Sequence, residues 1–324
     1  MNENEDLPKP IDFQERHQLE DEMVLVSWMY YEEGFTQSEI AQKLNMSRVK
    51  IIRLLQKAKS EGIVQFKISK SLPEERNLEV RLEAEYDLTQ AVVVRSKSTL
   101  DETTDDMGYR TAEIIRGKLF PECRLGVGWS TTILKVAPYL KKVTFDMTVN
   151  DLSGTFIGKT NPYSAAWLMA HNLGVKAETI PVPILIRNPV AYHGLLQEPS
   201  ISEALDHAKK CDIIIFGIGN LDTGALASPT GYFREQILQH LHEMGAVGDI
   251  LMRPFDITGN PIIYPLADQI ITLTIEEVMK IPFRIAIAAS ESKAKAILGA
   301  LRGGFIHCLI TDSNTARKTL SISH

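Results

Sequence analysis

The sequence is poor in the residues that build disulfide frameworks and metal sites. Only three cysteines, Cys123, Cys211 and Cys308, occur in 324 residues, and they stand far apart. An odd and dispersed set suits neither a disulfide scaffold nor a zinc site, and it is typical of a reducing compartment. The eight histidines show no metal-binding spacing. We therefore expect a cytoplasmic protein whose cysteines are small buried core residues.

Long apolar runs and an excess of positive charge are also missing. No stretch approaches the length of a membrane span, and the start, MNENEDLPKP, lacks the features of a secretory signal. We expect a protein that is neither secreted nor anchored. The net charge is −6, so any nucleic-acid binding should be confined to one local module. The length fits two domains.

Residues 35–59, FTQSEIAQKLNMSRVKIIRLLQKAK, contain the start signals of two short amphipathic helices. Thr36 and Glu39 have the spacing of a capping box, which predicts a helix beginning there. Ser47 follows a turn and is a good N-cap for a second helix over residues 48–59. The pattern predicts a helix-turn-helix.

The second helix should have an apolar inner face and a cationic outer face. We expect the following apolar residues to pack inward: Val49, Ile52, Leu55 and Ala58, flanked by Ile51 and Leu54. The polar residues are of types that contact phosphates and base edges in a major groove. The predicted DNA-binding residues are Thr36, Gln37, Ser47, Arg48, Lys50, Arg53, Gln56 and Lys57.

Charge favours this interpretation over a capped helix pair that never touches DNA. Residues 36–70 hold eight Lys and Arg against two acidic residues, on a chain that is acidic as a whole. Local positive charge on an acidic protein indicates a polyanion site.

The flanking segments complete the predicted DNA-binding domain, residues 19–70. Residues 1–18 should form a flexible tail, and residues 63–70 alternate like a strand that could serve as a wing. Residues 71–90 predict a charged linker helix, either a solvated connector or a dimer coil. A helix over residues 19–33 should bury Val24, Leu25, Trp28, Met29 and Tyr31.

Residues 91–324 predict an α/β domain with a mainly parallel sheet, because apolar strands alternate with amphipathic helices and Gly or Ser follows the strands. Ligands of such sheets bind beyond the carboxyl ends of the strands. The segment GVGWSTT, residues 126–132, offers glycines, hydroxyls and N–H groups at a helix start, as an anion cradle does. It lacks a P-loop lysine, and the alternative is a turn that only caps a helix.

Three more loops could converge on this cradle: LSG at 152–154, GIGNLDTG at 217–224 and GAVGDI at 245–250. Asp222 and Asp249 could accept hydrogen bonds from sugar hydroxyls, and Lys293 could pair with a phosphate. Turn, cap and surface roles are the local alternatives for these residues. The segment RNPVAYHG, residues 187–194, should be irregular and could cover a pocket.

The order of the motifs resembles the SorC family of bacterial transcriptional regulators, also called sugar-binding-domain or DeoR-like regulators. The resemblance runs from about residue 20 to 320 through TQSEIAQKL, SRVKIIRLLQKAKSEGIV, LGVGWSTT, LSG, PVPIL, GIG, GAVGDI with PFDITGN, and LRGGFIHCLITDSNTA. It implies a winged helix-turn-helix and an effector domain related in fold to sugar-phosphate isomerases and deaminases. It also implies a homo-oligomer, dimer or tetramer, that regulates a carbohydrate operon in response to a sugar or sugar phosphate. Our first hypothesis is therefore such a regulator, without catalysis or cofactor.

The resemblance also assigns roles to residues. It places a phosphate loop on Gly128, Trp129, Ser130, Thr131 and Thr132, an acidic effector residue on Asp249 and a lysine on Lys293. Ser153 and Asp222 complete the predicted effector site from the loops above. Two departures leave the effector open. Ala289-Ser290-Glu291 replaces a glycine pair before the lysine, and TFIGKTNPYS follows LSG in place of a glycine-rich run.

Two other functions stay open from the sequence. A sugar-phosphate isomerase or deaminase with an accessory helical domain is conceivable from the fold kinship, but Thr223 and Gly224 follow Asp222 where the deaminases have a histidine. The third is an assembly protein that neither binds DNA nor catalyses a reaction. The sequence does not choose the effector, the operator sequence, or repression over activation.

Overall fold

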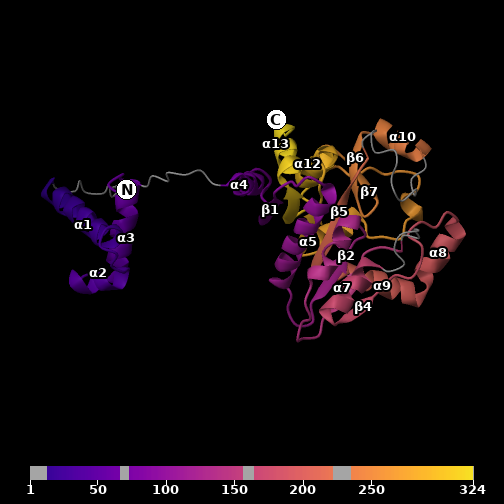
Figure 1. The fold of residues 1–324 in the computed structure, drawn as a ribbon, viewed down its shortest axis with the longest axis horizontal. Coiled ribbons are helices and arrows are strands. Elements are labelled where there is room, and N and C mark those ends of the chain that lie inside the picture. The colour runs from indigo at the N-terminus through magenta and orange to yellow at the C-terminus, as the bar shows by residue number, and fades with distance from the viewer. Residues whose placement is uncertain (1–12, 66–72, 156–163, 222–234, 324) are drawn as a thin grey trace, which may run out of the picture. The chain divides into compact units, whose positions relative to one another are not determined.

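The computed structural model describes residues 13–65, 73–155, 164–221 and 235–323 (Figure 1). The chain divides into two compact units, Met1–Ser71 and Leu72–His324, called here the N-terminal and C-terminal units. Each unit has its own hydrophobic core.

The described part of the N-terminal unit consists of three helices, α1 (Phe13–Tyr31), α2 (Gln37–Lys43) and α3 (Arg48–Ser60). The capping box is confirmed, since the Thr36 hydroxyl accepts from the Glu39 N–H at 3.3 Å and the Glu39 carboxylate accepts from the Thr36 N–H at 2.8 Å. Ser47 caps α3 by accepting from the Lys50 N–H at 3.2 Å. Asn45, at φ 52°, supplies the left-handed turn between α2 and α3. The helix-turn-helix follows from these local signals.

Helix α1 differs from its prediction in both start and phase. It begins at Phe13, and its buried face comprises Met23, Val26, Ser27 and Met29. The predicted burial of Val24, Leu25 and Trp28 was wrong, because all three are about half exposed. The consecutive apolar run MVLV does not select one helical face, so packing against α3 decides the phase. Most of the predicted wing, residues 66–70, lies outside the described residues.

Nine strands form the sheet of the C-terminal unit within the described ranges. Seven are parallel in the order β1-β9-β8-β5-β2-β3-β4, and β6 and β7 form an antiparallel hairpin paired to β5. The predicted α/β fold is therefore confirmed. The strands are β1 (Gln90–Val94), β2 (Arg124–Val127), β3 (Thr148–Asp151), β4 (Lys176–Glu178), β5 (Ile213–Asn220), β6 (Ala246–Ile250), β7 (Arg253–Asp256), β8 (Phe283–Ile287) and β9 (Cys308–Asp312).

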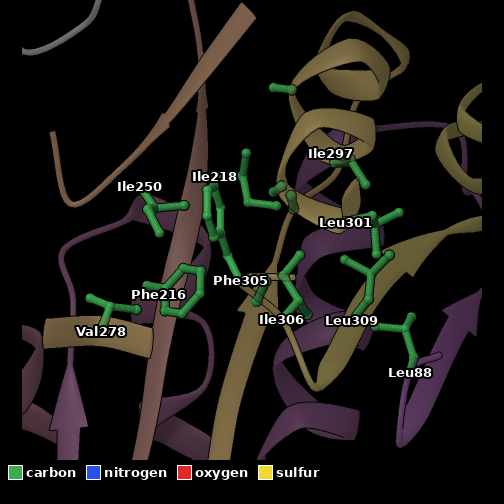
Figure 2. Packing of buried hydrophobic residues seen from close by; sticks show 14 of the residues in the cluster. Leu88, Phe216, Ile218, Ile250, Val278, Ile297, Leu301, Phe305, Ile306 and Leu309 are labelled. Carbon is green, nitrogen blue, oxygen red and sulfur yellow. The ribbon is translucent and has the colours of Figure 1, made fainter. Parts of the chain in front are cut away.

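Helices cover both faces of this sheet and create two cores. One core joins the sheet to α4, α9, α11, α12 and α13, and the other joins it to α5, α6 and α7. Figure 2 shows the first core, where Leu301 of α12 lies next to Leu309 of β9. The helices are α4 (Glu74–Tyr86), α5 (Leu100–Arg116), α6 (Thr131–Leu134), α7 (Ala165–Leu173), α8 (Pro189–Gln197), α9 (Pro199–Lys209), α10 (Glu235–Glu243), α11 (Ile275–Met279), α12 (Ala294–Arg302) and α13 (Ser313–Ser321), with short 3-10 turns η1 (Ala137–Tyr139), η3 (Ala267–Gln269) and η4 (Glu291–Lys293). Cys123, Cys211 and Cys308 are buried and free, as expected.

The predicted linker helix is α4, and it packs on the edge of the sheet. The Glu79 carboxylate accepts from the Val93 N–H at 3.0 Å, and the Glu83 carboxylate accepts from the Ala91 N–H at 2.9 Å. Leu78 and Leu82 of α4 are buried in the adjoining core, so α4 belongs to the C-terminal unit. The two carboxylates occupy the hydrogen-bonding edge of β1 that would otherwise be open to another strand.

Three other segments differ from expectation. Residues 189–197 form α8 because Asn188 caps the helix and Pro189 occupies its first position, where its missing N–H costs nothing. GAVGDI forms β6 rather than a loop, since Gly219 of β5 pairs with Asp249. The helix expected after Ser130 breaks into α6 and the turn η1, which contains Pro138.

Candidate DNA-reading helix and effector site

The predicted DNA-binding residues lie at the surface of the N-terminal unit. Gln37 and Lys57 are half-buried, and the other six are exposed: Thr36, Ser47, Arg48, Lys50, Arg53 and Gln56. The core side of α3 consists of Ile51, Leu54, Leu55 and Ala58. The predicted burial of Val49 was wrong, because its side chain is 58% exposed, and Ile52 is only half-buried.

The cations of α3 fall into two groups by their ion pairs. Lys50 lies 2.9 Å from a carboxylate oxygen of Glu22 on α1, and Lys57 lies 3.6 Å from Glu61. Such solvent-exposed pairs are weak and exchange readily for a phosphate. Within residues 13–65, the side chains of Arg48 and Arg53 make no ion pair. A phosphate or guanine that approached these arginines would displace no carboxylate.

The effector-site candidates converge on the carboxyl-terminal half of β5. Ser130 lies beside Gly217, since a Cβ built there would stand 2.8 Å from the Ser130 hydroxyl oxygen. Asp249 pairs with Gly219 in the antiparallel ladder. Lys293 donates from Nζ to the carbonyl of Ile218 at 2.8 Å. Three segments that are remote in sequence therefore meet on one strand. Figure 2 shows the buried residues Phe216 and Ile218 of this strand near Ile250 of β6.

The glycines of GIGN are required by the neighbouring side chains. A Cβ at Gly219 would fall 1.9 Å from the Asp249 Oδ1 atom, far inside contact distance. Gly217 leaves space for Ser130 in the same way, and Gly128 approaches Leu251 so closely that a Cβ would stand 2.8 Å from its Cδ2. The sequence GIG thus provides room for polar side chains against a strand backbone.

Asp249 and Lys293 have pKa values shifted by their surroundings. Burial raises the pKa of the Asp249 carboxyl to about 6, although a hydrogen bond from the Met252 N–H at 3.0 Å and the positive charge of Lys293 oppose this change. Burial lowers the pKa of Lys293, and the charge of Asp249 opposes it. Both groups are partly withdrawn from water, where a hydrogen bond to a ligand is stronger than at an open surface.

The Ser130 loop combines helix capping with the predicted anion cradle. The Ser130 hydroxyl accepts from the Thr132 N–H at 3.2 Å, so that N–H is already satisfied. Helix α6 has only four residues, and its macrodipole therefore contributes little to anion binding. Thr131 is exposed and Trp129 half-buried, whereas Gly128 and Thr132 are buried. Thr131 is therefore the one exposed residue of the five in this loop.

One predicted effector residue makes its contacts elsewhere, and another cannot be placed because it lies outside the described residues. Ser153 is buried, donates to the carbonyl of Gly154 at 3.2 Å and pairs through its backbone with Thr272. These contacts tie it to another loop rather than to β5. Asp222 lies outside the described residues.

The sequence interpretation missed two polar residues at the ends of strands. Asn220, the last residue of β5, donates from its amide to the carbonyl of Ser292 at 2.8 Å and so fixes the loop before Lys293. Asp151, the last residue of β3, accepts from the Ile180 N–H at 3.3 Å, and burial raises the pKa of its carboxyl to about 7. The signal in the sequence was a polar residue at the last position of a strand.

The departure at residues 289–291 has a structural consequence. Ser290 adopts φ 105°, a conformation that glycine adopts readily and other residues rarely. Its N–H donates to the Thr315 hydroxyl at 2.9 Å, and its own hydroxyl lies 2.9 Å from that of Ser292. Hydrogen bonds thus hold a strained residue just before Lys293.

The described ranges lack both a metal-binding cluster and a membrane-spanning helix. No group of three or more His, Cys, Asp or Glu residues there could hold a metal ion. No described helix is both long and apolar enough to cross a membrane.

This chain is similar to known proteins over both of its units. The family model of a sugar-binding domain matches residues 71–321. The chain is 26% identical over 305 residues to the sorbitol operon regulator of Klebsiella pneumoniae, covering 92% of this chain and 97% of the relative. It is 30% identical over 294 residues to the deoxyribonucleoside regulator of Bacillus subtilis, covering 89% and 94%.

The solved structure of one of these relatives also matches nearly the whole of this chain. The full-length sorbitol operon regulator SorC from Klebsiella pneumoniae superposes with a TM-score of 0.72 at 26% identity, covering 96% of this chain and all of that one. The match spans the helix-turn-helix as well as the sheet. The chain therefore belongs to the SorC family of transcriptional regulators, with a DNA-binding helix-turn-helix before a sugar-binding domain.

Proposed function

We propose that this regulator controls a carbohydrate-utilisation operon and that a sugar or sugar phosphate bound at the end of β5 changes its affinity for operator DNA. Helix α3 enters the major groove of a palindromic site, because a homo-oligomer presents two such helices. The names of its relatives, regulators of a sorbitol operon and of deoxyribonucleosides, support a carbohydrate effector. We further propose a cytoplasmic protein without catalysis or cofactor.

The convergence of Ser130, Asp249 and Lys293 on β5 is the observation that carries the effector proposal. Asp249 accepts hydrogen bonds from sugar hydroxyls, and Lys293 with the hydroxyls of Ser130 and Thr131 binds a phosphate or further hydroxyls. An effector shifts operator occupancy only if it binds one quaternary arrangement more tightly than another.

Ligand binding is tested by thermal unfolding of the full chain with a panel of free and phosphorylated sugars. A ligand at a hundred times its Kd raises stability by about 2.7 kcal/mol through mass action. Asp249→Asn and Lys293→Met should abolish the rise, whereas Lys318→Met, an exposed lysine of α13, should retain it. A ligand that stabilises all four proteins equally would place the effector elsewhere.

DNA binding is tested with the sequence upstream of the regulator's own gene at several salt concentrations. Arg53→Ala, at a base-reading position, should cost about 1–3 kcal/mol. Arg48→Ala, at a phosphate position, should reduce the slope of log K against log salt by about 1. Arg116→Ala, an exposed arginine of α5, serves as the control. Unchanged binding by both α3 variants would exclude α3 as the reading helix.

A further inference from the structure

Val49 stands out on α3 because it is apolar and exposed. Its side chain is 58% exposed, whereas Ile51, Leu54, Leu55 and Ala58 of the same helix are buried. Its neighbours Arg48 and Lys50 are exposed cations. The fold gains little from a β-branched residue at this position, since valine lowers helix propensity and here buries little surface.

The helical repeat places Val49 in the middle of the outward face. At about 100° per residue, Arg53 lies about 40° and Gln56 about 20° from Val49 around the helix axis. Ala58 of the core lies about 180° from Val49 on the same count. The row formed by Val49, Arg53 and Gln56 therefore points directly away from the core, and all three side chains are exposed.

The cations beside this row face sideways. Arg48 lies about 100° to one side of Val49, and Lys50 and Lys57 lie about 80–100° to the other. Residues on the flanks of a recognition helix meet the two phosphate backbones that border the groove, whereas the central row faces the base edges. Val49, the second residue of α3, is also in the N-terminal turn that approaches the bases most closely.

We propose that Val49 is a specificity-determining residue whose methyl groups contact the C5-methyl of a thymine in each operator half-site. A valine side chain neither donates nor accepts a hydrogen bond, and the thymine methyl is the apolar feature of the major-groove edge. Arg53 and Gln56 in the same row suit guanine and adenine. The inference rests on the proposed function, because it requires α3 to be the reading helix.

The test removes single methyl groups from the DNA. Operator fragments are first selected from a random duplex library with the full-length protein, and each thymine is then replaced by deoxyuridine, which lacks only the C5-methyl. One thymine per half-site should weaken binding about fourfold when replaced, as expected for loss of one buried methyl-sized group. In Val49→Ala the same replacement should have no effect. Val190→Ala, which alters an 82% exposed valine of α8, should keep the parent's fourfold response.

The outcomes separate this inference from the proposed function. If no deoxyuridine position distinguishes the parent from Val49→Ala while Arg53→Ala still weakens binding, Val49 does not read a thymine and the proposed function stands. If the parent selects no sequence and shows no salt-dependent DNA binding, both are overturned. Because Val49 is exposed, Val49→Ala should fold normally, and its unfolding midpoint is measured alongside.

Discussion

Helix α3 and the carboxyl end of β5 are built in opposite ways. The residues of α3 that face outward come from one short segment, and their charges are largely exposed. Ser130, Asp249 and Lys293 come from three distant segments, meet only because of the strand order, and include groups whose pKa values burial shifts. One site depends on local helix signals, and the other depends on the complete sheet. Substitutions should therefore affect them separately.

The largest expected effect is a loss of stability in the C-terminal unit when a buried arginine is replaced. Arg284 is 6% exposed, and its guanidinium donates to the carbonyls of Ile281 at 2.8 Å, Phe305 at 3.0 Å and Gly304 at 3.1 Å. Arg284→Ala should destabilise this unit by roughly 3–5 kcal/mol, because several buried carbonyls lose their donor at ~1–3 kcal/mol each. Chemical denaturation of the full chain measures the loss.

Hydrogen exchange shows where the Arg284→Ala loss occurs. The amides of α3 should keep their protection while those of β8 lose theirs, if the two units unfold separately. Arg302→Ala is the matched control, since Arg302 is exposed and donates to the carbonyls of Ile257 and Ser323. It should change stability by no more than about 0.5 kcal/mol. Equal loss of protection in α3 and β8 would contradict the separation.

The second effect is a pH dependence from Asp151. Its pKa rises from ~3.9 in the unfolded chain to about 7 in the folded one, so the folded state holds the proton more tightly. Stability from this group is therefore present below pH ~4 and is lost as the pH rises to ~7. Asp151→Asn keeps an acceptor for the Ile180 N–H without the charge. It should remove this slope and stabilise the protein at pH 8 by roughly 2–4 kcal/mol.

Asp249 provides the internal control for Asp151. The pKa of its carboxyl is raised to about 6, so its own contribution to stability is lost at a lower pH than the contribution of Asp151. In Asp151→Asn the remaining loss of stability should therefore end near pH ~6. Unfolding midpoints measured from pH 4 to 8 test both statements. A profile that Asp151→Asn leaves unchanged would mean that this carboxyl is ionised throughout the range.

Sequence reasoning succeeded where the signal was local. The caps Thr36 and Ser47, the turn at Asn45 and the alternation of strands and helices all follow from neighbouring residues. It failed where the sequence is compatible with more than one choice of the buried helix face. The run MVLV did not choose a helical face, and Val49 is apolar yet exposed because the core side of α3 is already filled by Ile51, Leu54, Leu55 and Ala58.

The effector site shows what else sequence could not supply. The motifs around Ser130, Asp249 and Lys293 were identified, but their meeting on β5 required the strand order and the pairing of Gly219 with Asp249. Ser153 fits its motif equally well and lies elsewhere. A motif gives the chemistry of a residue, whereas long-range pairing gives its position.

The third effect separates effector response from DNA binding. In Gly219→Ala the new Cβ would overlap the Asp249 carboxylate, so that side chain must move. We expect a loss of roughly 1–3 kcal/mol in stability from overpacking, a lost response to sugars, and unchanged DNA affinity. Gly194→Ala is the control, because a Cβ there meets nothing within 4 Å. If Gly219→Ala bound DNA more weakly than the parent in the absence of ligand, the two sites would be coupled more tightly than we propose.

The fourth effect compares a helix cap in each unit. Ser47 caps α3, and Thr99 caps α5 by accepting from the Glu102 N–H at 3.2 Å. Either change to alanine should cost about 1 kcal/mol locally. Ser47→Ala should lower hydrogen-exchange protection in α3 and weaken DNA binding, whereas Thr99→Ala should do neither. Similar DNA affinities of the two variants would show that α3 does not need its cap to read DNA.

The smallest effect is a gain in stability at the strained residue before Lys293. Ser290→Gly relieves the positive φ but adds freedom to the unfolded chain, so the net gain should be about 0.5–1 kcal/mol. For a unit of this size that raises the unfolding midpoint by about 2 °C. Ser292→Gly lacks that relief and should lower the midpoint. If Ser290→Gly were the less stable variant, the hydroxyl pair of Ser290 and Ser292 would outweigh the strain, and the loop before Lys293 would depend on a serine at this position.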